Sequence, residues 1–334
     1  SRFVFCTQPS DPPFPPLLAP SSRGLMTRFA ALLIALCPSI IHAYRPLSTG
    51  PRHALCGEQR TSAFRPGTTS VRLADAIMPP PLKSPAGIVD GAIASGTVKG
   101  DMPPAKIVLL GMVAGVHIGF GACLAVMVGG AVPAIKAANP GLQRIIQGAF
   151  GLPFGLLMTT ISGAELFTGN TAIVMTSFLH GKTSLLKLLK SWSCSWVGNL
   201  IGSLFIAWLF YLSGVMHSGV MATASAKASL TFVEAFVRGI LCNWLVCMAV
   251  WMAAGCQDLV SKAVAIWFPV SAFIALGLEH SVANMFIIPM GMMMGAKITV
   301  SDLLLKNLLP VTLGNTVGGA IAVASVFYIA HKKL

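Results

Sequence analysis

Two long apolar stretches of this chain contain the same polar pattern near their centres. The pattern is Gly-x-Glu-x-x-x-x-Asn, found at residues 163–170 and again at residues 277–284. A carboxylate in the middle of a membrane segment is costly, and it usually has a function. Each stretch is also longer than the roughly 20 residues that a straight helix needs to cross a bilayer. The sequence therefore predicts two membrane helices, each broken at the polar pattern.

The rest of the chain supports an all-α membrane protein. Only 10% of its 334 residues are charged, whereas a soluble domain has about 25%. The net charge of +13 does not indicate nucleic-acid binding, because most Arg residues lie before residue 106 and the later Lys residues lie at the ends of apolar stretches. We expect six membrane spans, at residues 106–132, 145–180, 185–213, 230–256, 262–296 and 302–330.

A second pair of matching motifs relates the two halves of the membrane part. The third span contains Gly-Asn-x-x-Gly at residues 198–202, and the sixth span repeats it at residues 314–318. Because each half holds three spans, an odd number, the second half must be inverted relative to the first. We therefore predict two inverted three-helix repeats with broken second and fifth helices, an architecture of transporters and channels.

The charged and amide residues of the repeated pattern allow two interpretations. Broken backbone inside a membrane must be buried in protein or line a cavity. In the first interpretation, Glu165 and Glu279 only satisfy the loose backbone ends, while in the second they contact the substrate. The sequence leaves both open. We expect Asn170 and Asn284 to act as helix caps that brace the breaks.

A histidine distinguishes the second break from the first. His280 follows Glu279, whereas Leu166 stands at the matching position of the first half. The repeat therefore does not need a histidine for structural reasons. Histidine titrates near neutral pH and can donate or accept a proton. We predict that His280 has a hydrogen-bonding or proton-transfer role.

The first hundred residues have the composition of a targeting sequence. Residues 26–43 have a basic start, a short apolar run and a small-residue end, as in a signal peptide, and residues 44–100 are rich in Ser, Thr, Pro and Arg, as in a transit peptide. Residues 61–66 resemble the Phe-centred cleavage motif of algae with complex plastids. We expect a disordered bipartite presequence over residues 1–100 and a six-span transporter domain over residues 101–334. The expected location is the plastid envelope, with the plasma membrane as the alternative.

The membrane part closely resembles the formate/nitrite transporter family. The most specific match is the run from Glu279 to Met285, Glu-His-Ser-Val-Ala-Asn-Met. The resemblance covers about residues 105–330 and implies an aquaporin-like fold, with one pore in each protomer of a homopentamer. It also implies passage of small monovalent anions, such as formate, nitrite, lactate or hydrosulfide, often together with a proton. Further matches lie at Gly163–Asn170, Asn243–Trp251, Pro289–Gly291 and Leu313–Asn315.

The same resemblance implies roles for individual residues. One group lines the substrate pore, a second forms apolar constrictions, and a lysine at the pore mouth attracts anions. In the second constriction, Leu152 stands where the family has the aromatic companion of Leu156, and Phe154 lies nearby as the alternative. The pore residues are His280, Thr168, Asn243 and Asn315, the constrictions are Leu166, Phe167 and Phe273 at the first break and Leu156 at the second constriction, and the lysine is Lys227.

These features predict a channel or transporter for weak-acid anions, and the family resemblance together with the expected plastid location implies nitrite or formate as the substrate. An apolar constriction excludes a bare anion because desolvation is costly, and a bound proton removes that penalty. The alternative is a neutral-solute facilitator of the aquaporin type, although the sequence lacks that family's Asn-Pro-Ala boxes. An enzyme is disfavoured because no metal-ligand spacing accompanies Glu165 and Glu279, so we expect no cofactor and no metal.

Overall fold

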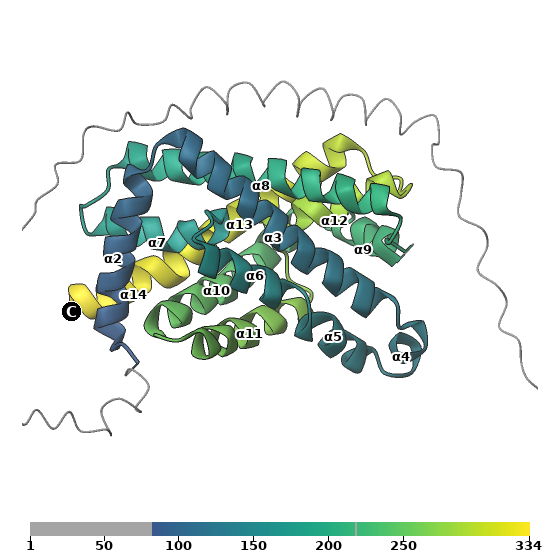
Figure 1. Cartoon of the computed structure of the whole chain (residues 1–334), viewed down its shortest axis with the longest axis horizontal. Coiled ribbons are helices and arrows are strands. Elements are labelled where there is room, and N and C mark those ends of the chain that lie inside the picture. The colour runs from purple at the N-terminus through teal and green to yellow at the C-terminus, as the bar shows by residue number, and fades with distance from the viewer. Residues whose placement is uncertain (1–81, 218) are drawn as a thin grey trace, which may run out of the picture. The chain divides into compact units, whose positions relative to one another are not determined.

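The computed structural model describes residues 82–217 and 219–334, and the regular elements within these residues are all helices (Figure 1). The predicted signal-like segment and the cleavage motif lie outside the described residues. The first seven helices are α2 (Pro85–Asp101), α3 (Pro104–Gly130), α4 (Pro133–Ala138), α5 (Pro140–Ala149), α6 (Leu152–Ser162), α7 (Phe167–Leu179) and α8 (Leu185–Ser213).

The second half of the chain ends in a long helix of mixed type. Two π-helical segments, η2 and η3, flank a regular α-helical stretch in it. The remaining elements of the chain are α9 (Gly219–Ala228), α10 (Phe232–Gly255), α11 (Leu259–Ala275), α12 (Ser281–Met293), η2 (Asp302–Leu308), α13 (Leu309–Val317), η3 (Gly318–Ser325) and α14 (Val326–Lys332), of which the last four form the long helix.

Five helical stretches of the described residues are long and apolar enough to cross a membrane. They fall in the first, second, third, fourth and sixth predicted spans. The fifth predicted span consists of two shorter apolar helices, α11 and α12. The five stretches are Pro104–Gly130, Pro140–Ser162, Leu185–Ser213, Phe232–Gly255 and Asp302–Lys332.

Helix α2 corrects the predicted extent of the presequence. Ser84 caps its N-terminus by accepting a hydrogen bond from the Gly87 amide. Helix α2 packs against α7, and its Asp90 pairs with Lys332 of α14. Figure 1 shows α14 beside α2. The expectation of a disordered segment is therefore wrong for residues 85–100. Small residues without a clear helical period concealed this helix, which is held by packing and not by its own amphipathic face.

Glycine residues set the positions of the breaks. Gly163, with φ of 69°, follows the last residue of α6, and the chain turns at Gly277, with φ of 71°, between α11 and α12. Glycine adopts this left-handed conformation without the steric penalty that other residues meet. Both interruptions lie at the repeated polar pattern. The second span also bends at Gly151, with φ of 122°, a feature that was not predicted.

Close backbone contact holds the long helices together. A methyl group at Gly115 of α3 would meet the backbone of Asn199 in α8, and one at Gly314 of α13 would meet the backbone of Phe236 in α10. Small residues of this kind let membrane helices approach closely. The same pairing of helices therefore occurs once in each half of the chain.

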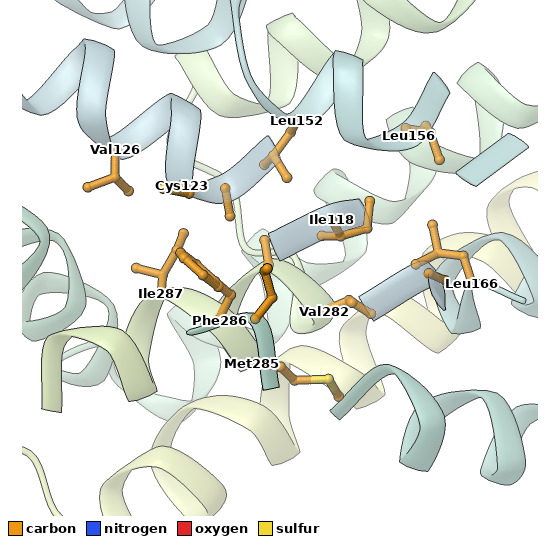
Figure 2. Packing of buried hydrophobic residues seen from close by; sticks show 14 of the residues in the cluster. Ile118, Cys123, Val126, Leu152, Leu156, Leu166, Val282, Met285, Phe286 and Ile287 are labelled. Atoms are coloured by element: carbon orange, nitrogen blue, oxygen red, sulfur yellow. The ribbon is translucent and has the colours of Figure 1, made fainter. Parts of the chain in front are cut away.

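The apolar core lies between α3, α6, α8, α10 and α12. Figure 2 shows Leu152 and Leu156 of α6 together with Ile118 of α3 and Phe286 of α12 in one buried cluster. The outward faces carry large apolar side chains, and Leu186 of α8 remains 80% exposed. A soluble protein rarely exposes extended apolar surface, whereas a protein embedded in a bilayer must.

Candidate functional site

The two breaks meet through one pair of buried side chains. Thr168 lies in the first turn of α7, and His280 directly precedes α12. The Thr168 Oγ1 and His280 Nε2 atoms are 3.0 Å apart, although the residues are separated by 112 positions. The ring of Phe273 stacks on His280, with centroids 5.9 Å apart. The structure thus brings together two residues that the family resemblance placed in the pore and one, Phe273, that it placed in a constriction.

The hydrogen bonds of His280 determine which ring nitrogen carries the proton in the neutral state. The Ala283 amide donates to His280 Nδ1 over 3.1 Å, so the histidine caps the N-terminus of α12. An atom that accepts a backbone N–H cannot carry a proton itself. The neutral ring therefore has its proton on Nε2 and donates it to Thr168 Oγ1. The hydroxyl hydrogen of Thr168 is then free to point toward a bound molecule.

Three side chains hold the backbone carbonyl of Thr168 in place. Asn243 Nδ2 lies 3.2 Å from this oxygen, Thr171 Oγ1 lies 2.6 Å away, and Cys247 Sγ lies 3.3 Å away. Sequence analysis found Asn243 but missed Thr171 and Cys247. Thr171 bonds to the carbonyl three residues before it within α7, whereas the contact of Cys247 depends on how α10 packs against α7, and no sequence spacing reveals that.

Asn315 and Asn199 brace the two breaks in the same way. Asn315 Oδ1 accepts from the Ser281 amide over 2.9 Å. Asn315 Nδ2 donates to the backbone carbonyls of Gly239 and Glu279. Asn199 Oδ1 likewise accepts from the Phe167 amide over 2.9 Å. The side chain of Asn315, predicted to line the pore, is thus occupied by backbone groups, and it positions the first residue of α12.

Both glutamates are buried and paired with a lysine and an asparagine. Glu165 Oε1 lies 2.6 Å from Lys99 Nζ, and its Oε2 accepts from Asn170 over 2.7 Å. A buried carboxylate with these partners is stabilised where it stands and holds the neighbouring loop. The second half repeats the arrangement with Glu279, Lys227 at 2.8 Å and Asn284 at 2.6 Å. This geometry favours the bracing interpretation of the glutamates.

Lys99 is a site residue that sequence analysis missed. It precedes Lys227 by 128 positions (99 to 227), and the same offset separates Gly111 from Gly239 (111 to 239), whose carbonyls accept from Asn199 and Asn315. The motifs of the sequence repeat at offsets of 114 and 116 residues (163 to 277 and 198 to 314), which do not lead from Lys227 to Lys99, so the match between the two lysines appears only in the structure. Lys227 itself is not a free cation at a pore mouth, because Glu279 neutralises it.

The residues predicted as constrictions are buried and apolar. Leu156 and Leu166 are 3% and 4% exposed and belong to one core cluster, as Figure 2 shows. Phe167 is buried at the start of α7. Leu152 lies in the same cluster, whereas Phe154 is 49% exposed. Leu152 and not Phe154 therefore stands beside Leu156.

Comparison with known proteins gives a consistent result. The family model described as "Formate/nitrite transporter" matches residues 86–329, a range that includes α2. A "Probable formate transporter" of Methanothermobacter thermautotrophicus is 40% identical over 272 residues, which are 75% of this chain and 98% of the relative. The "Formate channel FocA" of Escherichia coli K12 is 32% identical over 275 residues, 75% of this chain and 94% of the relative.

Solved structures show the same fold. An "FNT family ion channel" has a TM-score of 0.68 and 30% identity, over 73% of this chain and 98% of the other. A "Pentameric formate channel with formate bound" has a TM-score of 0.60 and 30% identity, over 68% and 97% of the two chains. These relatives are transporters and channels, not enzymes. The chain belongs to the formate/nitrite transporter family.

Proposed function

We propose that this protein is a channel for small monovalent weak-acid anions, with formate or nitrite as its substrate, and that the anion crosses together with a proton. The observation that carries the proposal is the Thr168–His280 pair, buried between apolar side chains at the meeting point of two broken helices. Two of the relatives named above are described as formate channels.

The physical argument rests on desolvation. An anion that reaches Leu156 and Leu166 must lose its water, and that is costly in an apolar surrounding. A weak acid avoids this cost by taking up a proton before it passes. The neutral acid then meets the Thr168 hydroxyl, whose orientation is fixed by the Nε2–H group of His280. Lys99 and Lys227 each lie at one break, where a glutamate neutralises the charge.

The proposed architecture is two inverted repeats with six crossings, assembled as a homopentamer. The matching hydrogen bonds of Asn199 and Asn315 support the repeat. Each side chain binds the first amide of a half-helix and the backbone carbonyl of a glutamate. The solved relative described as pentameric supports the assembly. The exposed apolar faces supply surface for both lipid and neighbouring protomers.

Transport in liposomes tests the proposed function. We expect purified protein to take up labelled formate and nitrite with a matching uptake of protons, and His280→Ala to reduce both greatly. Normal proton uptake in this variant would exclude His280 from the proton pathway. Rapid osmotic swelling without any anion dependence would favour the neutral-solute facilitator instead. Uptake of nitrite, formate, lactate and bicarbonate, measured side by side, ranks the substrates.

We also propose that residues 1–84 direct the protein to the plastid envelope. The composition of the signal-like and transit-like segments supports this proposal. The full chain, tagged at its C-terminus and expressed in an alga with complex plastids, is expected at the plastid. Replacement of Phe64 by Ala is expected to stop import, and location of the unaltered chain at the plasma membrane would contradict the proposal.

A further inference from the structure

One histidine lies at the centre of an apolar membrane helix without a partner for its ring. His117 stands thirteen positions from either end of α3 (104 to 117 and 117 to 130). Its Nδ1 atom is buried without a hydrogen-bond partner, no hydrogen bond of Nε2 is found among the described residues, and the residue is partly exposed. Lipid tails offer neither donors nor acceptors, so polar side chains within a bilayer pair with protein groups. The ring therefore needs a partner that the described residues of one protomer do not supply.

His117 belongs to an outward face that α3 shares with α6. Phe120 and Leu124 follow the histidine by three and seven positions, the spacing of one helix face, and both are exposed. Helix α6 packs beside this stripe, because a methyl group at its Gly155 would meet the carbonyl of His117. Phe154, directly before Gly155, is also exposed. We define the first-half face by five residues, which are Leu109, His117, Phe120, Leu124 and Phe154.

The second half of the chain has a matching face on α10 and α11. The offset of 128 positions that relates the two lysines of the breaks also relates Leu109 to Val237 (109 to 237), which are 44% and 43% exposed. It relates Leu124 to Met252 (124 to 252), which are 37% and 38% exposed. On α11, the exposed Phe268 matches the exposed phenylalanine of α6 at the offset of 114 positions (154 to 268). We define the second-half face by five residues, which are Val237, Leu241, Trp244, Met252 and Phe268.

Trp244 gives the second-half face a hydrogen-bond donor near the middle of the membrane. It lies twelve positions after the start of α10 and eleven before its end (232 to 244 and 244 to 255), and it is 46% exposed. The indole N–H groups of Trp192 and Trp196 donate within the protomer, whereas that of Trp244 has no partner among the described residues. An indole N–H can only donate, and a ring nitrogen of histidine can accept it. The two faces thus carry complementary polar groups at the centres of their helices.

The two polar groups distinguish faces that are otherwise alike. Leu245 matches His117 at the same offset (117 to 245), and Val116 matches Trp244 (116 to 244), so each face has only one of the two groups. A closed ring of identical protomers with cyclic symmetry needs two different surfaces on each protomer, one of which meets the other on the next protomer. The two halves of this chain supply such a pair of surfaces.

We propose that the first-half face of one protomer packs against the second-half face of its neighbour, with the Trp244 indole N–H of one protomer donating to the His117 ring of the next. This inference rests on the proposed homopentamer and assigns its contact surfaces. The occupant of each face is a second copy of this chain and not lipid, because lipid tails would leave both polar groups unsatisfied.

Photo-crosslinking tests the two faces. Benzoylphenylalanine is placed at position 117 of the full-length protein, which is reconstituted in lipid nanodiscs and irradiated. We expect a ladder of crosslinked subunits on denaturing gels, and mass spectrometry should map the linked peptides to α10 and α11. The control is the same probe at Val197, which is 44% exposed in the middle of α8 and belongs to neither face. There it should react with lipid and give no ladder.

A double-mutant cycle tests the hydrogen bond between the faces. His117→Phe and Trp244→Phe each remove one partner and keep an aromatic ring. A hydrogen bond between membrane helices contributes about 0.6 kcal/mol, so each variant should lower the association constant of neighbouring protomers about three-fold, measured by dissociation on dilution in detergent. The double variant should lose no more than either single variant, because both remove the same bond. Trp196→Phe is the matched control, because its indole bonds to Thr312 within the protomer, and it should leave dissociation unchanged.

Two results would overturn the inference. The first is crosslinking from position 117 to lipid alone, or to a neighbour through helices other than α10 and α11. The second is a pair of losses in His117→Phe and Trp244→Phe that add up in the double variant, because the two side chains then do not bond to each other. An unaltered protein that is monomeric in detergent and in lipid is a different outcome, because it contradicts the proposed homopentamer itself.

Discussion

The Nζ atom of Lys99 lies 2.6 Å from Oε1 of Glu165 and joins helix α2 to the first break. Removing one partner of a buried ion pair leaves an uncompensated charge, and the usual destabilisation is about 3–5 kcal/mol. Lys99 keeps 19% of its side chain exposed, so we expect Lys99→Ala to fall at the lower end of this range. Thermal unfolding of the purified protein in detergent measures the loss.

The double variant Lys99→Met with Glu165→Gln is the control for this pair. It removes both charges together, so it should unfold closer to the unaltered protein than the Lys99→Met variant does. If the destabilisations of Lys99→Met and Glu165→Gln add up to that of the double variant, α2 and the first break are not coupled through this contact.

The Thr168 hydroxyl makes a second prediction possible. Thr168→Val keeps the shape of the side chain but removes the group that His280 orients, and we expect formate uptake to fall about 2–10-fold, the effect of one lost hydrogen bond. Thr168→Ser should retain most uptake. Thr176→Val is the matched control, because the Thr176 hydroxyl bonds only to the Ala172 carbonyl within the same helix. Equal uptake in both valine variants would contradict the assigned role.

Close packing around Thr171 and Asn243 gives a third prediction. A methyl group at Gly319 of η3 would overlap the Thr171 hydroxyl and approach the Asn243 amide. Gly319→Ala should therefore displace the donors that hold the Thr168 carbonyl and reduce formate uptake without preventing membrane insertion. A methyl group at Gly169 would meet only Val250, at an ordinary 3.5 Å. Gly169→Ala is thus the control, and comparable losses in both variants would count against a specific effect at Gly319.

A fourth prediction concerns acid stability at the end of α2. The hydrogen bond and charge of Lys187, 2.6 Å from the Asp101 carboxylate, hold the pKa of Asp101 below its ordinary value of 3.8. Because the folded pKa is the lower one, the pair stabilises the fold above the unfolded pKa, and this contribution is lost as the pH falls through the folded pKa.

The unaltered protein should therefore melt at a higher temperature than Asp101→Asn at pH 7, and the difference should vanish at strongly acidic pH. The effect is small and falls with added salt, because both side chains are about half exposed. A difference that grows on acidification would show that the carboxylate is not stabilised by Lys187.

The breaks could be predicted from the sequence because their causes are local. A glycine followed two positions later by a glutamate inside an apolar stretch can be recognised in the sequence, and this pattern occurs twice. The inward-facing positions of Leu156 and Leu166 followed from the family resemblance. Helix α2 could not be predicted, because it lacks an apolar stripe and is ordered by its contacts with α7, α8, α10 and α14.

The partners of polar side chains were much harder to predict. Lys227 could be identified as a cation near the membrane, but its pairing with Glu279 depends on how α9 packs against α12. The cap that His280 forms on Ala283 sets the position of its proton, and that requires the backbone geometry of the break. Asn243 Oδ1 is buried without a hydrogen-bond partner among the described residues, and this follows only from knowing where Nδ2 of the same side chain points.

The order of the ion pairs along the chain has a consequence for biogenesis. In each half the lysine precedes its glutamate, by 66 residues for Lys99 and Glu165 and by 52 residues for Lys227 and Glu279. Ribosomes make the chain from its N-terminus, so each counter-ion has been synthesised before the acid that needs it. A glutamate entering the bilayer during synthesis therefore finds its cation already made, and the interval during which it is charged and alone in the lipid is shortened.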